Sequence, residues 1–290
     1  MAAEIPPRQV EAEADSEPAA SRTADGVATL RAMHQLLDAK PPILDDPVSV
    51  ALVGRARVDA IRANADRASV PAVAGLRSHI VLRSRYAEDR LAAAVSRGVS
   101  QAVALGAGLD TFAYRQPAWA AGLRVFEVDH RASQRMKRDR LAAAGVVVPG
   151  NVVFVAVDLD AEPLGPGLAA AGFDAGSPAF VSCLGVLAYL APATVDRVFD
   201  WVASLSRGSE FVFTIAQPAA GPERGTAARA AELDEPWRTR LDPETVVARL
   251  TDLGFESVTF LEPAEAAAYF AGRSDSLRPP RRISIARAVL

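Results

Sequence analysis

The sequence contains one cysteine, Cys183, among 290 residues, so one molecule cannot form an internal disulfide. Cys183 stands in an apolar run, which favours a buried packing thiol in a reducing compartment over a nucleophile. Apolar runs are also too short to span a bilayer, which needs roughly 18–20 residues. The first residues are acidic where a signal peptide would be basic and then apolar. We therefore predict a cytoplasmic protein without a membrane segment.

Net charge is small as well. The 32 Lys and Arg residues against 35 Asp and Glu leave a formal charge of -3 at pH 7. Without a global basic field the chain is not typical of nucleic-acid-binding proteins. We expect a small-molecule substrate as the partner, no nucleic acid and no metal site, and the residues indicate no particular oligomeric state.

The first two dozen residues have few large apolar side chains and are rich in Ala, Glu and Pro, which predicts a disordered tail over residues 1–24. From Asp25, apolar residues recur at helical spacing until Lys40 and two prolines stop the run. Two more helices are predicted from about residue 48 to 67 and from about 76 to 97. Because no repeat or low-complexity linker follows, residues 25–290 are predicted to form one domain.

From residue 101 the chain alternates between short apolar runs and helical stretches. Five strand-like runs end near residues 105, 129, 158, 185 and 216, and two more cover 255–262 and 281–290. A continuous run such as "VVFVAV" is typical of a strand buried on both faces. No clear crossover helix separates the last two runs, so we expect an antiparallel final strand. The pattern predicts an α/β, Rossmann-like fold with a mostly parallel seven-stranded sheet and helices on both faces.

The first of these strands leads into Gly106-Ala107-Gly108, which is half of a dinucleotide-binding loop. A pyrophosphate needs a third glycine at the start of the next helix, and this loop has none. Asp110 falls near the position that a phosphate would take and would repel it. A nicotinamide-dependent oxidoreductase is therefore the disfavoured alternative.

Acidic residues end the next two predicted strands. Asp129 stands 23 residues after Gly106, a spacing that suits a carboxylate binding ribose hydroxyls. Asp158 ends the third strand at the same edge of the sheet. S-adenosylmethionine carries an ammonium and a sulfonium but no phosphate, so these residues favour it over a dinucleotide.

Five stretches resemble the leucine carboxyl methyltransferase family in order and spacing. They are "RSRYAED" (83–89), "QAVALGAGLDTFAYR" (101–115), "VFEVDH" (125–130), "VAVDLD" (155–160) and "LGVLAYL" (184–190). The resemblance covers the chain from about residue 23 to its end. That family includes S-adenosylmethionine-dependent O-methyltransferases acting on protein C-termini and on polyketide-type small molecules. It implies the class I methyltransferase fold and this cofactor.

The resemblance also implies a set of cofactor contacts. Arg85 would pair with the cofactor carboxylate, and Asp129 would hold the ribose. The methionine moiety would contact Gly106, Ala107 and Gly108. The adenine would lie beside Asp158 and Leu159. Plainer roles stay open for two of them, with Arg85 as a solvated helix cation and Asp129 as the cap of the next helix.

Two positions depart from the family pattern. Leu184 replaces a glutamate that usually precedes "GLLxYL", and Phe112 replaces the arginine of "DTRAYRL". A leucine cannot help to satisfy a cation, so Leu184 favours altered cofactor binding or a site recruited for other chemistry. The alternative is then a methyltransferase-fold protein that transfers no methyl group, such as a cyclase-like or isomerase-like enzyme or a binding protein.

We predict an O-methyltransferase acting on a carboxylate or hydroxyl of a small molecule, of the secondary-metabolite kind. A carboxylate is already ionised near neutral pH, whereas a phenol or alcohol needs a base. The catalytic residue is not identified, and the weak candidates are His79, Tyr86 and Tyr189. The resemblance further implies that residues 217–241, with the N-terminal helices, form a lid over the substrate pocket. The small residues of this segment suit such a lid, and Trp237 could line the pocket.

Overall fold

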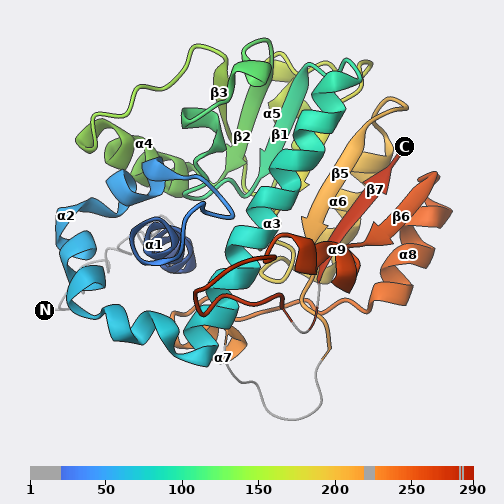
Figure 1. The fold of residues 1–290 in the computed structure, drawn as a ribbon. Coiled ribbons are helices and arrows are strands. Elements are labelled where there is room, and N and C mark those ends of the chain that lie inside the picture. The colour runs from blue at the N-terminus through green and yellow to red at the C-terminus, as the bar shows by residue number, and fades with distance from the viewer. Residues whose placement is uncertain (1–20, 219–225, 281, 283) are drawn as a thin grey trace, which may run out of the picture.

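The computed structural model describes residues 21–218, 226–280, 282 and 284–290 (Figure 1). Most of the expected tail, residues 1–20, lies outside them. Within the described residues one seven-stranded sheet runs in the order β3-β2-β1-β4-β5-β7-β6. The strands are β1 (Gln101–Leu105), β2 (Arg124–Asp129), β3 (Val152–Ala156), β4 (Phe180–Cys183), β5 (Glu210–Thr214), β6 (Ser257–Phe260) and β7 (Ile285–Val289). Each lies inside a run that the sequence marks as a strand.

Strands β1 to β5 pair in parallel, and β7 pairs antiparallel with both β5 and β6. The predicted fold class is therefore confirmed. The antiparallel strand lies between β5 and β6 rather than at the edge of the sheet. Among its described residues, the connection from β6 to β7 carries only the short helix α9 (Pro263–Ala268), too little for the crossover that a parallel partner requires.

Alternate residues of one strand serve two hydrophobic cores. Phe211 and Phe213 of β5 pack on the face covered by α5 (Leu164–Ala170), α6 (Pro192–Ala203) and α8 (Pro243–Asp252). Val212, between them, packs on the face covered by α3 (Pro71–Ser96) and α9. Helices thus lie on both faces, as predicted, and Figure 1 shows α3 crossing the sheet.

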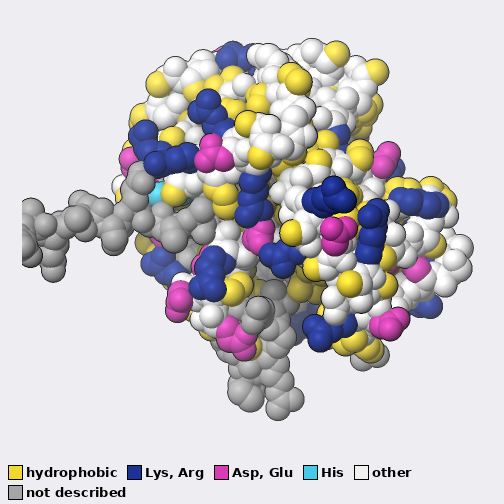
Figure 2. Space-filling model, turned by 90° about the vertical axis from the view of Figure 1, so that its left-hand side faces the viewer, with side chains coloured by type: hydrophobic (Ala, Val, Ile, Leu, Met, Phe, Trp, Pro, Cys, Tyr) yellow, Lys and Arg dark blue, Asp and Glu magenta, His cyan; other side chains and the backbone are white. Residues whose placement is uncertain are grey.

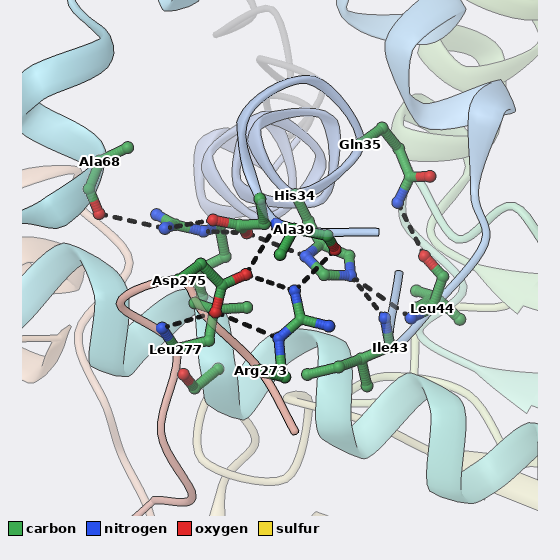
Figure 3. A network of polar contacts seen from close by, with 12 residues as sticks. His34, Gln35, Ala39, Ile43, Leu44, Ala68, Arg273, Asp275 and Leu277 are labelled. Carbon is green, nitrogen blue, oxygen red and sulfur yellow. Dashed lines mark hydrogen bonds and ion pairs between the residues drawn. The ribbon is translucent and has the colours of Figure 1, made fainter. Parts of the chain in front are cut away.

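The predicted helices at the N-terminus are present as α1 (Arg22–Leu37), α2 (Pro47–Ala63) and α3. A buried polar network fixes the end of α1 to α3 (Figure 3). His34 Nδ1 lies 2.9 Å from Asp38 Oδ2, and Arg77 Nε donates to the same oxygen at 2.7 Å. The other ring nitrogen of His34 accepts from the Ile43 N–H at 3.0 Å, so His34 is a structural residue.

One connection differs from the sequence reading, and another lies partly outside the described residues. Between β1 and β2 only the 3₁₀ turns η2 (Phe112–Tyr114) and η3 (Ala118–Ala120) form, where a helix was expected. Pro117 and Gly122 lie in this short segment and disfavour a longer helix. In the expected lid, α7 (Thr226–Glu232) is formed, and residues 219–225 lie outside the described part of the chain.

Candidate cofactor and substrate site

The loop after β1 requires glycine at Gly106 for two reasons. Its φ is +61°, a conformation that L side chains rarely adopt, and a Cβ there would lie 2.4 Å from Cγ2 of Val186. Val186 belongs to the segment after β4. The Ala107 N–H donates to the Val128 carbonyl at 3.1 Å, which fixes the loop to the neighbouring strand β2. The carboxyl ends of β1, β2 and β4 therefore meet at this loop.

Asp129 lies directly beside the loop. Its Oδ2 accepts from the Gly108 N–H at 2.5 Å and its Oδ1 from the His130 N–H at 2.7 Å. Burial raises the pKa of this carboxyl, and the two backbone hydrogen bonds oppose that shift. Each oxygen keeps a second lone pair, enough for the two hydroxyls of a ribose. The helix α4 (Arg131–Ala143) is capped instead by His130, whose Nδ1 accepts from the Ala132 N–H.

Asp158 and Leu159 follow β3 at the same edge of the sheet. The Val157 N–H donates to the Asp129 carbonyl at 3.0 Å, which places the end of β3 beside Asp129. Asp158 is partly exposed, and its Oδ1 accepts from the Asp160 N–H at 3.0 Å. Leu159 is buried in the core. The sequence-predicted groups for ribose and adenine are therefore neighbours in space.

Arg83 is a candidate site residue that sequence reasoning missed. It projects from α3 against Gly185, where a Cβ would lie 2.4 Å from its Nη1. Its Nε is buried without a hydrogen-bond partner, and the described residues offer it no ion pair within 4 Å. Burial, followed by the charge of Arg31, lowers the pKa of Arg83 to about 10, so it remains a cation at neutral pH. A partly buried guanidinium without an ion-pair partner attracts an anion.

Arg85, the predicted partner of the cofactor carboxylate, lies elsewhere. Its Nε donates to Asp89 at 2.8 Å, its side chain is 45% exposed, and the structure does not bring it to the loop. Two residues that stand two positions apart in a helix are rotated by about 200° around its axis. Arg83 and Arg85 therefore cannot both face the sheet. The spacing of Arg83 to the buried Ala87 and Leu91, four and eight residues on, is the sequence signal that identifies it.

Arg31 forms ion pairs next to the loop after β1. Arg31 of α1 donates to the Leu109 carbonyl, and its guanidinium lies 3.4 Å from Asp110 and 3.5 Å from Asp46. Arg31 is almost fully buried. The N-terminal helix α1 is thus attached directly to the loop after β1.

Leu184 and Phe112, the two departures from the family pattern, line the same small cavity between α3 and the sheet. Three carboxylates also line it, from Glu88, Asp110 and Glu127. The cavity therefore joins an apolar wall to acidic groups immediately below the loop.

Of the three catalytic candidates, two lie near Arg83. His79 is one helical turn before Arg83, and burial, then the Arg83 charge, lower its pKa to about 3. Tyr189 also interacts electrostatically with Arg83. Tyr86 lies apart, in the core between α3 and the sheet, where burial and the charge of Glu265 raise its pKa. The structure therefore does not bring Tyr86 to the site.

The second half of the expected lid bridges α1 and the segment after β4. Glu235 accepts from the Thr23 N–H at 3.2 Å and from the Ser21 hydroxyl at 3.1 Å. The Arg238 N–H donates to the Ala188 carbonyl at 2.7 Å, and its guanidinium lies 2.5 Å from Asp160. We call residues 234–241 the strap. It spans from the N-terminal helix to the acidic residues after β3.

Other kinds of site find little support in the described residues. They contain no group of three or more His, Cys, Asp or Glu side chains that could hold a metal ion, and no helix long and apolar enough to cross a membrane. Figure 2 shows basic and acidic side chains intermixed on the face that it presents.

Comparisons with known proteins are a separate line of evidence. Residues 24–203 match the family described as leucine carboxyl methyltransferase. A Frankia alni protein, provisionally named an S-adenosyl-L-methionine-dependent methyltransferase, is 34% identical over 252 residues, covering 85% of this chain and 86% of that protein. A protein of Mycolicibacterium paratuberculosis with the same provisional name is 32% identical over 244 residues, 78% of this chain and 77% of that one.

Solved structures support the fold alone. A protein of Thermobifida fusca, provisionally titled a methyltransferase, aligns with a TM-score of 0.56 at 20% identity, covering 95% of this chain and 96% of that chain. A Streptomyces avermitilis protein of the DUF574 family aligns with a TM-score of 0.53 at 17% identity, covering 90% and 96%.

Proposed function

The chain belongs to the leucine carboxyl methyltransferase family of S-adenosyl-L-methionine-dependent methyltransferases, and we propose that it methylates an oxygen atom of a small molecule, with a carboxylate as the acceptor. The observation that carries this proposal is that the three histidines of the chain are poorly suited to act as a general base. All three lie in the described residues: His34 and His130 are held in structural hydrogen bonds, and burial lowers the pKa of His79 to about 3.

The described residues fit the cofactor. The buried, unpartnered Nε of Arg83 suits the cofactor carboxylate, and we propose Arg83 in the role expected of Arg85. The loop over residues 106–108 would hold the methionine moiety, and Asp129 the ribose. Asp158 and Leu159 would border the adenine. The bound cofactor supplies an electrophilic methyl group on a sulfonium.

A hydroxyl acceptor would need a base in the site. A general base works best when its pKa lies near the working pH, and His79, at about 3, is far below neutrality. His34 is held in the network of Figure 3, and His130 caps α4. A carboxylate acceptor is already ionised and needs no proton removed. Positioning and exclusion of water are then the protein's main contributions.

The strap and its residue Trp237 are suited to excluding water and positioning the substrate. The strap joins α1 to the segment after β4, and in this position it would limit the access of water to the site. Trp237, within the strap, has a buried indole N–H that finds no hydrogen-bond partner in the described residues, so it can donate to an acceptor oxygen. Tyr189, which interacts electrostatically with Arg83, would help to orient the same substrate.

The test is transfer from methyl-labelled S-adenosyl-L-methionine to parallel panels of carboxylic acids and phenols. Methyl esters release labelled methanol in mild alkali, whereas methyl ethers do not. Base-labile label in the acid panel is the expected result. Base-stable label confined to the phenols would replace the carboxylate by a hydroxyl acceptor.

Leu184 is the residue that favours the second function, a protein with the methyltransferase fold that transfers no methyl group. Calorimetric titration with S-adenosyl-L-methionine and S-adenosylhomocysteine separates the two. Absence of binding to both ligands would contradict methyl transfer and favour the alternative. The small-molecule acceptor, the secondary-metabolite role and the cytoplasmic location stay predictions.

A further inference from the structure

The methionine end of the cofactor is a zwitterion, so its site needs an anion as well as a cation. Arg83 offers the cation. The ammonium group requires an acceptor, and Leu184, on the wall of the cavity between α3 and the sheet, cannot supply one. The three carboxylates on that wall are the candidates.

Two of these carboxylates are already occupied. Glu127 is almost fully buried, with the Lys137 ammonium at 2.8 Å and the Tyr114 hydroxyl donating at 2.6 Å. Glu88 receives both terminal nitrogens of Arg115, one on each oxygen. Recruiting either group for a ligand would break a buried ion pair, which costs several kcal/mol.

Asp110 has acceptor capacity to spare. Its Oδ1 accepts only from the Phe112 N–H, at 2.9 Å, and its Oδ2 lies 3.4 Å from Arg31, a long contact for a charge-assisted bond. The side chain is 30% exposed, against 19% for Glu88 and 2% for Glu127. Burial acts to raise the pKa of Asp110, but Arg31 and other nearby cations lower it, so the group is ionised.

Asp110 and Arg83 are also placed as a pair. They interact electrostatically, yet their charged groups form no ion pair within 4 Å. A zwitterion between them would satisfy both charges. We propose that Asp110 accepts the hydrogen bond of the cofactor α-ammonium while Arg83 binds the α-carboxylate. This inference rests on the proposed function, because it assumes that the cofactor binds here.

The experiment compares two ligands on each protein. S-adenosylhomocysteine carries the ammonium, and its deamino analogue, with a thiobutanoate chain, lacks only that group. For Asp110→Asn, calorimetry should show about tenfold or greater loss of affinity for the first ligand. The deamino analogue should lose about twofold or less. Asp110→Ser, which keeps a side-chain acceptor for the Phe112 N–H, should behave alike and serves if the asparagine variant does not fold.

A matched control and a rescue sharpen the result. Glu88→Gln alters another carboxylate of the same cavity and should leave the ratio of the two affinities as in the wild type. Adding Leu184→Glu to Asp110→Asn should restore the preference for the ammonium-bearing ligand. Equal loss of both ligands in Asp110→Asn and Asp110→Ser would overturn the inference, since Asp110 would then only shape the loop. If the wild type binds neither ligand, the proposed function fails instead.

Discussion

Val186 lies so close to Gly106 that a Cβ built on the glycine would be 2.4 Å from Cγ2 of the valine. The contact joins the ends of β1 and β4, which are neighbours in the sheet, at the loop over residues 106–108. Any side chain at Gly106 must therefore separate the strand ends or displace the loop, and the positive φ adds backbone strain.

Gly106→Ala should consequently destabilise the fold by about 1–3 kcal/mol, as overpacking and a left-handed alanine typically do. Chemical denaturation measures the loss. Gly122→Ala is the matched control because a Cβ there meets nothing within 4 Å. Adding Val186→Ala should recover the steric part of the loss only. A Gly106→Ala variant as stable as the wild type would show that the loop is not held as described.

Asp129→Asn should weaken S-adenosylhomocysteine binding by about tenfold or more. An amide presents one oxygen and one NH₂, so it cannot accept from the Gly108 and His130 N–H groups while also accepting from a ribose. Calorimetric titration measures the affinity. Asp139→Asn, at an exposed position of α4, is the control and should bind normally. Undiminished binding by Asp129→Asn would place the ribose elsewhere.

Glu235→Gln should loosen the strap and the start of α1 together. The carboxylate accepts from the Arg22 and Thr23 N–H groups, where negative charge is favoured by the helix dipole. We expect a loss of about 1 kcal/mol, or a melting temperature lower by roughly 2–4 °C. Hydrogen exchange should accelerate in the first turn of α1 and in the strap. Acceleration in only one of them would mean that Glu235 does not couple the two.

The order of the strands and the acidic residues at their ends could be predicted because both depend on local patterns. Continuous apolar runs mark buried parallel strands, and the carboxyl ends of such strands share one edge. Asp129 and Asp158 therefore came together as expected. The insertion of β7 between β5 and β6 depends on long-range pairing, which no local pattern records.

The face of α3 that packs against the sheet was harder to predict from the sequence. Five of the eight residues in "RSRYAEDR" are charged, and Arg83 and Arg85 are among them, so polarity does not reveal which arginine faces the sheet. Burial of Ala87 and Leu91 decides it in favour of Arg83, although alanine is a weak signal of a buried face. The free acceptor capacity of Asp110 depends on how Arg31 and Arg115 distribute their contacts, which only the folded chain shows.

His79 should make the stability of the protein depend on pH. Its pKa is about 3 in the folded chain, because of burial and then of Arg83, against 6.5 when unfolded. Between these values the unfolded state binds the proton and the folded state does not, so stability falls as the pH drops below about 6.5. For this partly exposed side chain we expect a loss of about 1–2 kcal/mol from pH 7 to pH 5.

Urea denaturation at pH 7 and pH 5 isolates this contribution when the wild type is compared with His79→Gln, which cannot titrate in this range. The raised pKa values of Glu88 and Asp129 stabilise the fold toward low pH in both proteins and cancel in the difference. The variant should lose less stability than the wild type on acidification. Equal losses would mean that the imidazole takes up its proton in the folded state, and His79 would then regain its place as a candidate base for a hydroxyl acceptor.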